Sequence, residues 1–132
     1  MKYMIMLYGS QADYDAMVGK STTKPAWSPD DFAAMGAFME QWNNELVETR
    51  ALAAPIHTRR YGAKDGTAFV TDGPYAETQE VLAGYTIVEC ESFDRATEIA
   101  AKLAKCPPGP GGSDGQYADV RPIQEGYEDF VS

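Results

Sequence analysis

The 132-residue sequence predicts an α+β fold of the ferredoxin-like type: an antiparallel sheet with two helices on one face and an inserted β-hairpin. Three observations lead to this prediction. The elements follow in the order strand, helix, hairpin, strand, helix, strand; both helices begin at a serine cap; and the strands show apolar runs or alternation. This length fits one domain. We assign it to residues 1–123 and expect an acidic tail at 124–132.

The first strand is predicted at residues 3–8, an unbroken apolar run that ends at Gly9. Residues 9–27 are polar and lack an apolar period, so we expect a loop there. It would serve either as a lid or binding segment or as a plain surface connection.

The first helix is predicted to begin at Ser28, because its hydroxyl can accept from the Asp31 amide and Pro29 suits a first turn. Apolar residues then recur every three or four positions and predict one core-facing stripe: Phe32, Met35, Met39, Trp42 and Leu46.

The hairpin is predicted from a strand at residues 52–61, an Asp65-Gly66 turn and a return strand at 67–71. Pro55 favours a sheet edge or a bulge in the first strand. Residues 84–91 form a further strand, whose alternate side chains point to opposite faces.

The second helix is predicted at residues 93–105, with Ser92 as its cap and a last strand at 117–123. Four residues would face the core: Ala96, Ile99, Ala100 and Leu103. Helices on one face leave the other face of the sheet bare. We therefore expect a homodimer formed sheet to sheet.

Composition excludes several classes of protein. Eleven basic and twenty acidic residues give a net charge of −9, which argues against a nucleic-acid-binding surface. Every apolar run is too short for a signal peptide or a membrane span, so we expect a cytoplasmic protein without a membrane partner. Cys90 and Cys106 are then expected to be free thiols. One histidine and two distant cysteines predict no metal site, and no motif indicates a cofactor.

A local basic patch surrounds the only histidine. Residues 50–64 contain four basic residues and no acidic one. On a strand, His57, Arg59 and Tyr61 would share a face. A histidine is the residue type suited to proton transfer near neutral pH, and Arg59 suits a small anion such as a carboxylate or a phenolate. The alternative is a charged edge strand that resists aggregation.

A second candidate is the turn that contains Asp72, Gly73 and Pro74. A rigid turn at the end of a strand holds an acid in fixed geometry, which suits a general base. The alternative is a purely structural Asx-turn.

The string Thr71-Asp72-Gly73-Pro74-Tyr75-Ala76-Glu77-Thr78, with residues 82–85 and 120–123, resembles the YCII-related family, also called DGPF-domain proteins. The resemblance implies a small bacterial protein with a dimeric ferredoxin-like fold. Some relatives are enzymes, among them a dehydrochlorinase, and a His–Asp pair is suggested as catalytic. Asp72 matches the acid. The family's histidine lies in the first helix, which has none here, so His57 would have to replace it.

These observations together predict a cleft for a small anionic or phenolic ligand. Its catalytic residues would be Asp72 and His57, and its substrate-binding residues Tyr8, Arg59, Tyr75 and Glu77. The predicted chemistry is cofactor-free proton transfer or elimination on a small acid, and aromatic acids are among the candidate substrates. The alternative is a non-catalytic regulatory or interaction module linked to transcription or metabolite sensing.

Overall fold

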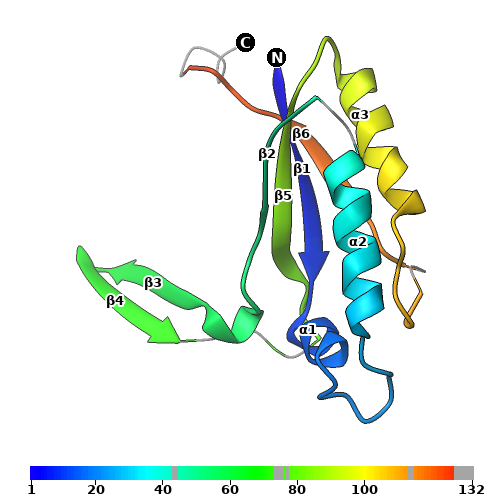
Figure 1. Ribbon diagram of the computed structural model, residues 1–132. Coiled ribbons are helices and arrows are strands. Elements are labelled where there is room, and N and C mark those ends of the chain that lie inside the picture. Colours follow the sequence, from blue (N-terminus) through cyan, green and yellow to red (C-terminus); the bar gives the residue numbers. More distant parts are fainter. Residues whose placement is uncertain (43–44, 73–75, 77, 113–114, 127–132) are drawn as a thin grey trace.

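The computed structural model describes residues 1–42, 45–72, 76, 78–112 and 115–126. Its main sheet has four antiparallel strands in the order β2-β5-β1-β6 (Figure 1). The strands are β1 (Lys2–Gly9), β2 (Leu46–Ala51), β5 (Val81–Glu89) and β6 (Ala118–Pro122). With helical segments between β1 and β2 and a helix between β5 and β6, this is the ferredoxin-like order, so the predicted fold class is confirmed.

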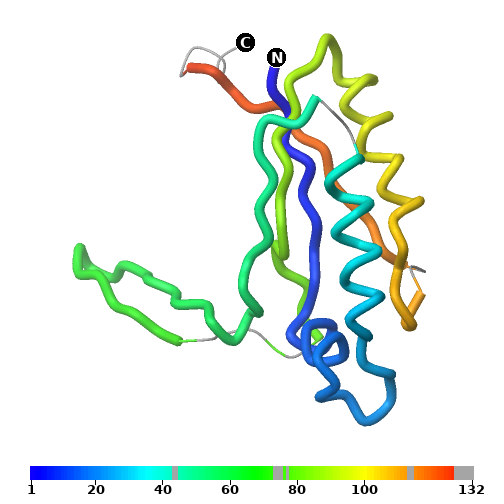
Figure 2. Tube along the Cα trace, in the orientation of Figure 1, coloured from blue at the N-terminus to red at the C-terminus, as the bar shows by residue number. Residues whose placement is uncertain are grey.

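Two helices cover one face of this sheet, as the tube in Figure 2 shows. They are α2 (Pro29–Gln41) and α3 (Phe93–Ala101), and α3 continues into a 3₁₀ turn at Lys102–Lys105. Each begins as predicted: the Ser28 hydroxyl accepts from the Asp31 amide, and the Ser92 hydroxyl accepts from the Arg95 amide. Residues 127–132 of the predicted tail lie outside the described residues.

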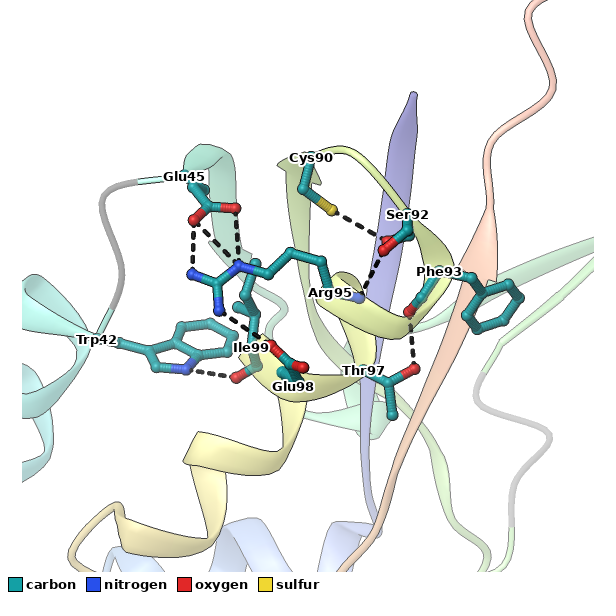
Figure 3. Close-up of polar contacts among 9 residues, drawn as sticks. All are labelled: Trp42, Glu45, Cys90, Ser92, Phe93, Arg95, Thr97, Glu98 and Ile99. Atoms are coloured by element: carbon teal, nitrogen blue, oxygen red, sulfur yellow. Dashed lines mark hydrogen bonds and ion pairs between the residues drawn. The ribbon is translucent and has the colours of Figure 1, made fainter.

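The core lies between the sheet and the helices. Ile5 and Val88 from the central strands pack with Ala96, Ile99 and Trp42. The indole Nε1 of Trp42 donates to the Ile99 carbonyl across 2.9 Å, which joins the end of α2 to α3 (Figure 3). Burying this donor with a partner avoids the cost of an unpaired polar group.

An ion-pair cluster closes the same junction at the surface. The Arg95 guanidinium binds the carboxylate of Glu45 at 2.6 Å and that of Glu98 at 3.2 Å (Figure 3). The Arg95 hydrogen bond lowers the pKa of Glu45, and the two carboxylates raise the pKa of Arg95.

One prediction fails between the first strand and α2. Residues 9–27 were expected to form a loop, but helix α1 (Gln11–Met17) lies within them. Its N-terminus is a full capping box of Ser10 and Asp13. Only Ala16 is buried, so α1 leaves almost no apolar period in the sequence.

The predicted apolar stripe is right at Trp42 and wrong at both ends. Phe32 is 38% exposed and contacts the Trp27 ring instead of the core. Leu46 packs against the core, but from β2, because the helix ends at Gln41. The three- and four-residue spacing of apolar side chains continues past the end of α2 and into β2 by coincidence.

The strand predicted at residues 52–61 is also wrong. Strand β2 ends at Ala51, Pro55–His57 is a 3₁₀ turn, and β3 (Arg59–Lys64) begins only afterwards. Buried Pro55 starts the turn, where its missing N–H is tolerated. Strand β2, the edge of the main sheet, was not predicted.

The hairpin itself is confirmed. Strand β3 pairs with β4 (Thr67–Asp72) in a separate two-stranded sheet, which we call the arm, residues 59–72. Asp65 and Gly66 both have positive φ, as a two-residue hairpin turn requires. Figure 1 shows the arm extending away from the helices, beyond β2.

Cys90 and Cys106 are free thiols, as expected. No helix in the described part of the chain has the length and apolar character needed to cross a membrane.

Candidate functional site

Arg59 and Asp72 stand directly opposite each other where the arm begins and ends. The guanidinium Nε lies 3.4 Å from the Asp72 Oδ1, and the two side chains are 78% and 85% exposed. An exposed ion pair of this length contributes little to stability, about 0–1 kcal/mol. Both groups are therefore accessible to a ligand that offers a better-placed charge.

His57 lies two residues before Arg59, at the last position of the 3₁₀ turn, and is exposed. The prediction that His57, Arg59 and Tyr61 share one strand face is wrong for His57, because the strand begins only at Arg59. In the described part of the chain, no hydrogen bond joins His57 to Asp72. Their action as a pair therefore stays a prediction.

Helix α1 braces the root of the arm, which we define as residues 52–58. The Ile56 amide donates to Gln11 Oε1 at 2.8 Å. The Tyr14 phenol donates to the carbonyl of Leu52 at 2.9 Å and to that of Ala83 at 3.3 Å. Partial burial raises the pKa of Tyr14, so it stays a hydrogen-bond donor at neutral pH. This brace fixes where the arm leaves the body.

Tyr8 belongs to a different cluster, at the end of β1 on the sheet face opposite the helices. Its phenol donates to Asp119 Oδ2 at 2.8 Å, and its ring stacks on that of Tyr117 at a centroid distance of 5.3 Å. The hydrogen bond to Asp119 raises the pKa of Tyr8, and a hydrogen bond with Glu80 raises that of Tyr117. Both phenols therefore act as donors, not as bases.

The two clusters lie at the same end of the sheet but two strands apart. Tyr8 pairs with Leu82 on β5, while Ala51, the last residue of β2 before the root, pairs with Gly84 on the other side of β5. Strands lie about 4.8 Å apart, so β1 and β2 are separated by roughly 10 Å. The structure thus brings Arg59 and Asp72 together and leaves Tyr8 apart. Tyr75 and Glu77 lie outside the described residues.

Tyr117, Asp119 and Glu80 were not predicted as site residues. Side-chain alternation in the last predicted strand could have indicated two of them, because Tyr117 and Asp119 fall on the same face of that strand. Their meeting with Tyr8 depends on β6 pairing with β1, which is a long-range relationship.

The face that carries Tyr8 is bare of helices and apolar at its centre. The register places Met4 opposite Ile87 and Met6 opposite Tyr85, all half-buried. Charged side chains surround them: Lys2, Glu48, Arg50, Glu89, Asp119 and Arg121. An apolar centre with a charged rim is the usual composition of a protein interface.

No group of three or more histidine, cysteine, aspartate or glutamate side chains suited to a metal ion occurs among the described residues.

A family model for the YCII-related domain matches residues 1–121. The chain belongs to the YCII-related domain family. An uncharacterized protein of Rhizobium meliloti (strain 1021) is 41% identical over 78 residues, which are 59% of this chain and 54% of that relative. The chain thus matches about half the length of this relative.

Among solved structures, the YCII chain is similar to a 5-chloro-2-hydroxyhydroquinone dehydrochlorinase of Burkholderia phenoliruptrix in complex with 2,5-dihydroxybenzoquinone. The match covers 97% of this chain and 98% of the other, with a TM-score of 0.42 and 17% identity. A likeness at this level assigns no activity to the present protein.

Proposed function

We propose that this YCII-family protein is a homodimer that binds a small carboxylate or phenolate at the base of the arm. Arg59 is the anion-binding group, and Asp72 and His57 are the groups that move a proton. The Arg59–Asp72 pair carries this proposal, because it presents an accessible guanidinium whose present partner is itself a carboxylate.

A ligand carboxylate competes with Asp72 for the guanidinium, since both can form the same two-point contact with arginine. Once the ligand takes the guanidinium, the Asp72 carboxylate lies beside the ligand as a base. A base so placed removes a proton from carbon, and departure of a leaving group from the adjacent carbon completes an elimination without a cofactor. Tyr75 and Glu77, which follow Asp72 in the chain, are the proposed remaining lining.

Ligand binding is tested by thermal shift with benzoate and 4-hydroxybenzoate, with neutral benzamide as the matched control ligand. A ligand at about 100 times its Kd stabilises the folded state by roughly 2.7 kcal/mol, an increase of several degrees in Tm. We expect Arg59→Ala to abolish the shift. Arg50→Ala, which removes another exposed arginine bound to a glutamate, is the control and retains it. A shift that survives Arg59→Ala contradicts the proposed anion site.

Proton transfer is tested separately with phenylpyruvate, a small acid that carries an exchangeable proton on the carbon beside its carbonyl, by following deuterium incorporation in D2O by NMR against the rate without protein. We expect exchange that Asp72→Asn removes while the thermal shift persists. Binding without exchange in the native protein would instead support the second candidate, a metabolite-binding regulatory module. The exposure of the pair favours that candidate, because electrostatic catalysis is strongest where water is excluded.

The dimer is proposed to form through the bare sheet face. Its apolar centre of Met4, Met6, Tyr85 and Ile87 supports this, because such a patch is costly to leave in water. Introducing positive charge into the apolar centre, with Met4→Lys and Ile87→Lys, is expected to give monomers in sedimentation equilibrium. A dimer that survives this double substitution contradicts the sheet-to-sheet arrangement.

A further inference from the structure

The charged side chains around the apolar centre of the bare sheet face balance in sign. Three are basic and three are acidic: Lys2, Arg50, Arg121, Glu48, Glu89 and Asp119. The whole chain has eleven basic and twenty acidic residues, so this face is neutral within a strongly acidic protein. A neutral face can approach a second acidic copy at a lower electrostatic cost than an acidic face could.

The strand register arranges these charges in rows that cross the sheet from β2 through β5 and β1 to β6, and directly opposed residues share a face. The two central rows are Glu48, Ile87, Met4, Arg121 and Arg50, Tyr85, Met6, Asp119. Each central row therefore carries opposite charges at its two ends, and the signs reverse from one row to the next. In an outer row, Glu89 on β5 lies opposite Lys2 on β1.

This arrangement of charges is self-complementary about one axis. Two copies of a sheet face pack about a two-fold axis that lies between the sheets. If the axis runs along the strands, each row of one copy lies over the same row of the other with its ends exchanged, and aligned packing within about 30° keeps the central rows together. Each charge then faces an opposite charge: Glu48 with the partner's Arg121, Arg50 with the partner's Asp119, and Glu89 with the partner's Lys2.

An axis across the strands matches fewer charges. It exchanges neighbouring rows, so that Glu48 faces the partner's Arg50. The outer row of Lys2 and Glu89 then lies over the row at the other end of the face, where Tyr8 and its neighbour on β5 are uncharged. The axis along the strands is therefore favoured, because it pairs every charge of the rim.

The same axis covers exposed apolar side chains at the Tyr8 end of the face. Leu82 lies opposite Tyr8, and Leu52 follows Arg50 by two residues, which places both leucines on this face. Leu52, Leu82 and Tyr117 are all exposed in the single chain. Exchanging the ends of the row places the Tyr8–Tyr117 pair of one copy over the two leucines of the other.

We infer that the two copies are related by a two-fold axis along the strands of the main sheet, with the charged rims paired across it. This inference rests on the dimer proposed above and adds its orientation and its contacts. Leu52 is the first residue of the arm root, so the partner's Tyr117 then borders the root of the arm. Each candidate site thus lies beside the tyrosine pair of the other copy, although the two clusters are apart within one chain.

The first test mixes two chains that each carry one reversed charge. Glu48→Arg alone and Arg121→Glu alone place like charges against each other in both rim contacts, so sedimentation equilibrium should show dimer affinity lowered about tenfold or more. An equimolar mixture of the two should form heterodimers with close to native affinity, because each contact then joins opposite charges. Glu48→Arg mixed with Arg50→Glu is the matched control and should stay weak.

Each other outcome of the mixing contradicts the inference in a distinct way. Recovery in the control mixture alone indicates the axis across the strands, which overturns the inferred orientation and leaves the sheet-to-sheet dimer standing. Native affinity in every single variant shows that the rim makes no contact and overturns the inference, while the Met4→Lys and Ile87→Lys variant still tests the dimer itself. A monomeric native protein overturns both.

A second test locates the Tyr117 end of the contact. The photoreactive substitution Tyr117→p-benzoylphenylalanine is introduced, and isotopically light and heavy chains are mixed before irradiation. We expect mixed-isotope cross-links to the arm root, residues 52–58. Mixed-isotope cross-links to the end of β6 instead, cross-links found only within one chain, or none at a concentration where the protein is dimeric, overturn the inference.

Discussion

The Tyr8 phenol donates to Asp119 Oδ2 across 2.8 Å, and this contact joins the end of β1 to the start of β6 on the bare sheet face. Two side chains that are 111 positions apart in the sequence are thereby fixed in position relative to each other. The Tyr117 ring, stacked on that of Tyr8, adds an aromatic contact to this hydrogen bond.

Alkaline pH is expected to weaken the fold through this cluster. The folded-state pKa of Tyr8 is raised above its ordinary value of 10.0 by the Asp119 hydrogen bond, so its stabilisation is complete below that value. This stabilisation is lost as the pH rises through the higher folded-state pKa of Tyr8. Urea unfolding from about pH 8 to about pH 11 should show a smaller loss in Tyr8→Phe than in the native protein. Tyr61→Phe, on the exposed arm, should follow the native curve.

Acidic pH is expected to weaken the helix junction of Figure 3. Arg95 lowers the folded pKa of Glu45 below its ordinary value of 4.5. The ion pair therefore stabilises the fold fully above pH 4.5, and this stabilisation is lost as the pH falls through the lower folded-state pKa of Glu45. Glu45→Gln should flatten the fall in unfolding free energy toward acid pH. Glu40→Gln, an exposed carboxylate on α2, is the control, and an equal flattening there would refute this assignment.

Gly109→Ala is expected to destabilise the protein by about 1–3 kcal/mol. Gly109 has φ +70°, and an added Cβ would overlap the Trp27 ring, which lies over it. Gly112→Ala is the matched control, because Gly112 has φ +71° and a Cβ there meets nothing within 4 Å. Urea denaturation of both variants gives the measurement, and equal stabilities would show that Trp27 does not pack on this loop.

Gln11→Ala is expected to loosen the root of the arm. Loss of the hydrogen bond to the Ile56 amide removes about 1 kcal/mol locally, which corresponds to roughly fivefold faster hydrogen exchange at that amide. The Leu52 amide, bonded to the Ala83 carbonyl at 2.8 Å, is the internal control and should exchange at its native rate. Equal acceleration at both amides would indicate general destabilisation instead of a local brace.

The elements that were predicted correctly depend on neighbours in the chain. Ser28 with Asp31 and Ser92 with the Arg95 amide are contacts over three residues, so their capping roles can be recognised from spacing. The Asp65-Gly66 turn needs positive φ at both positions, which these residue types tolerate. Buried Thr86 and Val88 alternate with outward residues on β5, as a strand with one covered face requires.

The failures occur where a local pattern competes with packing. Helix α1 is stabilised by its N-terminal cap and by contacts to the arm root, and it buries only Ala16. Its sequence therefore shows no apolar period from which a helix could be predicted. The run from β2 to β3 was taken as one strand, although Pro55 is buried in a turn that redirects the chain.

Composition, spacing and element order therefore suffice for the fold class, the helix starts and the hairpin, because these follow from residues near one another in the chain. They indicated Arg59 and Asp72 only as separate candidates, and the pairing of β3 with β4 places the two side chains opposite each other. The order β2-β5-β1-β6 established the rest: it placed Tyr8 with Asp119 and separated both from the arm. Strand order follows from burying the helix-facing side chains of distant segments together, and no local stretch of chain encodes that free energy.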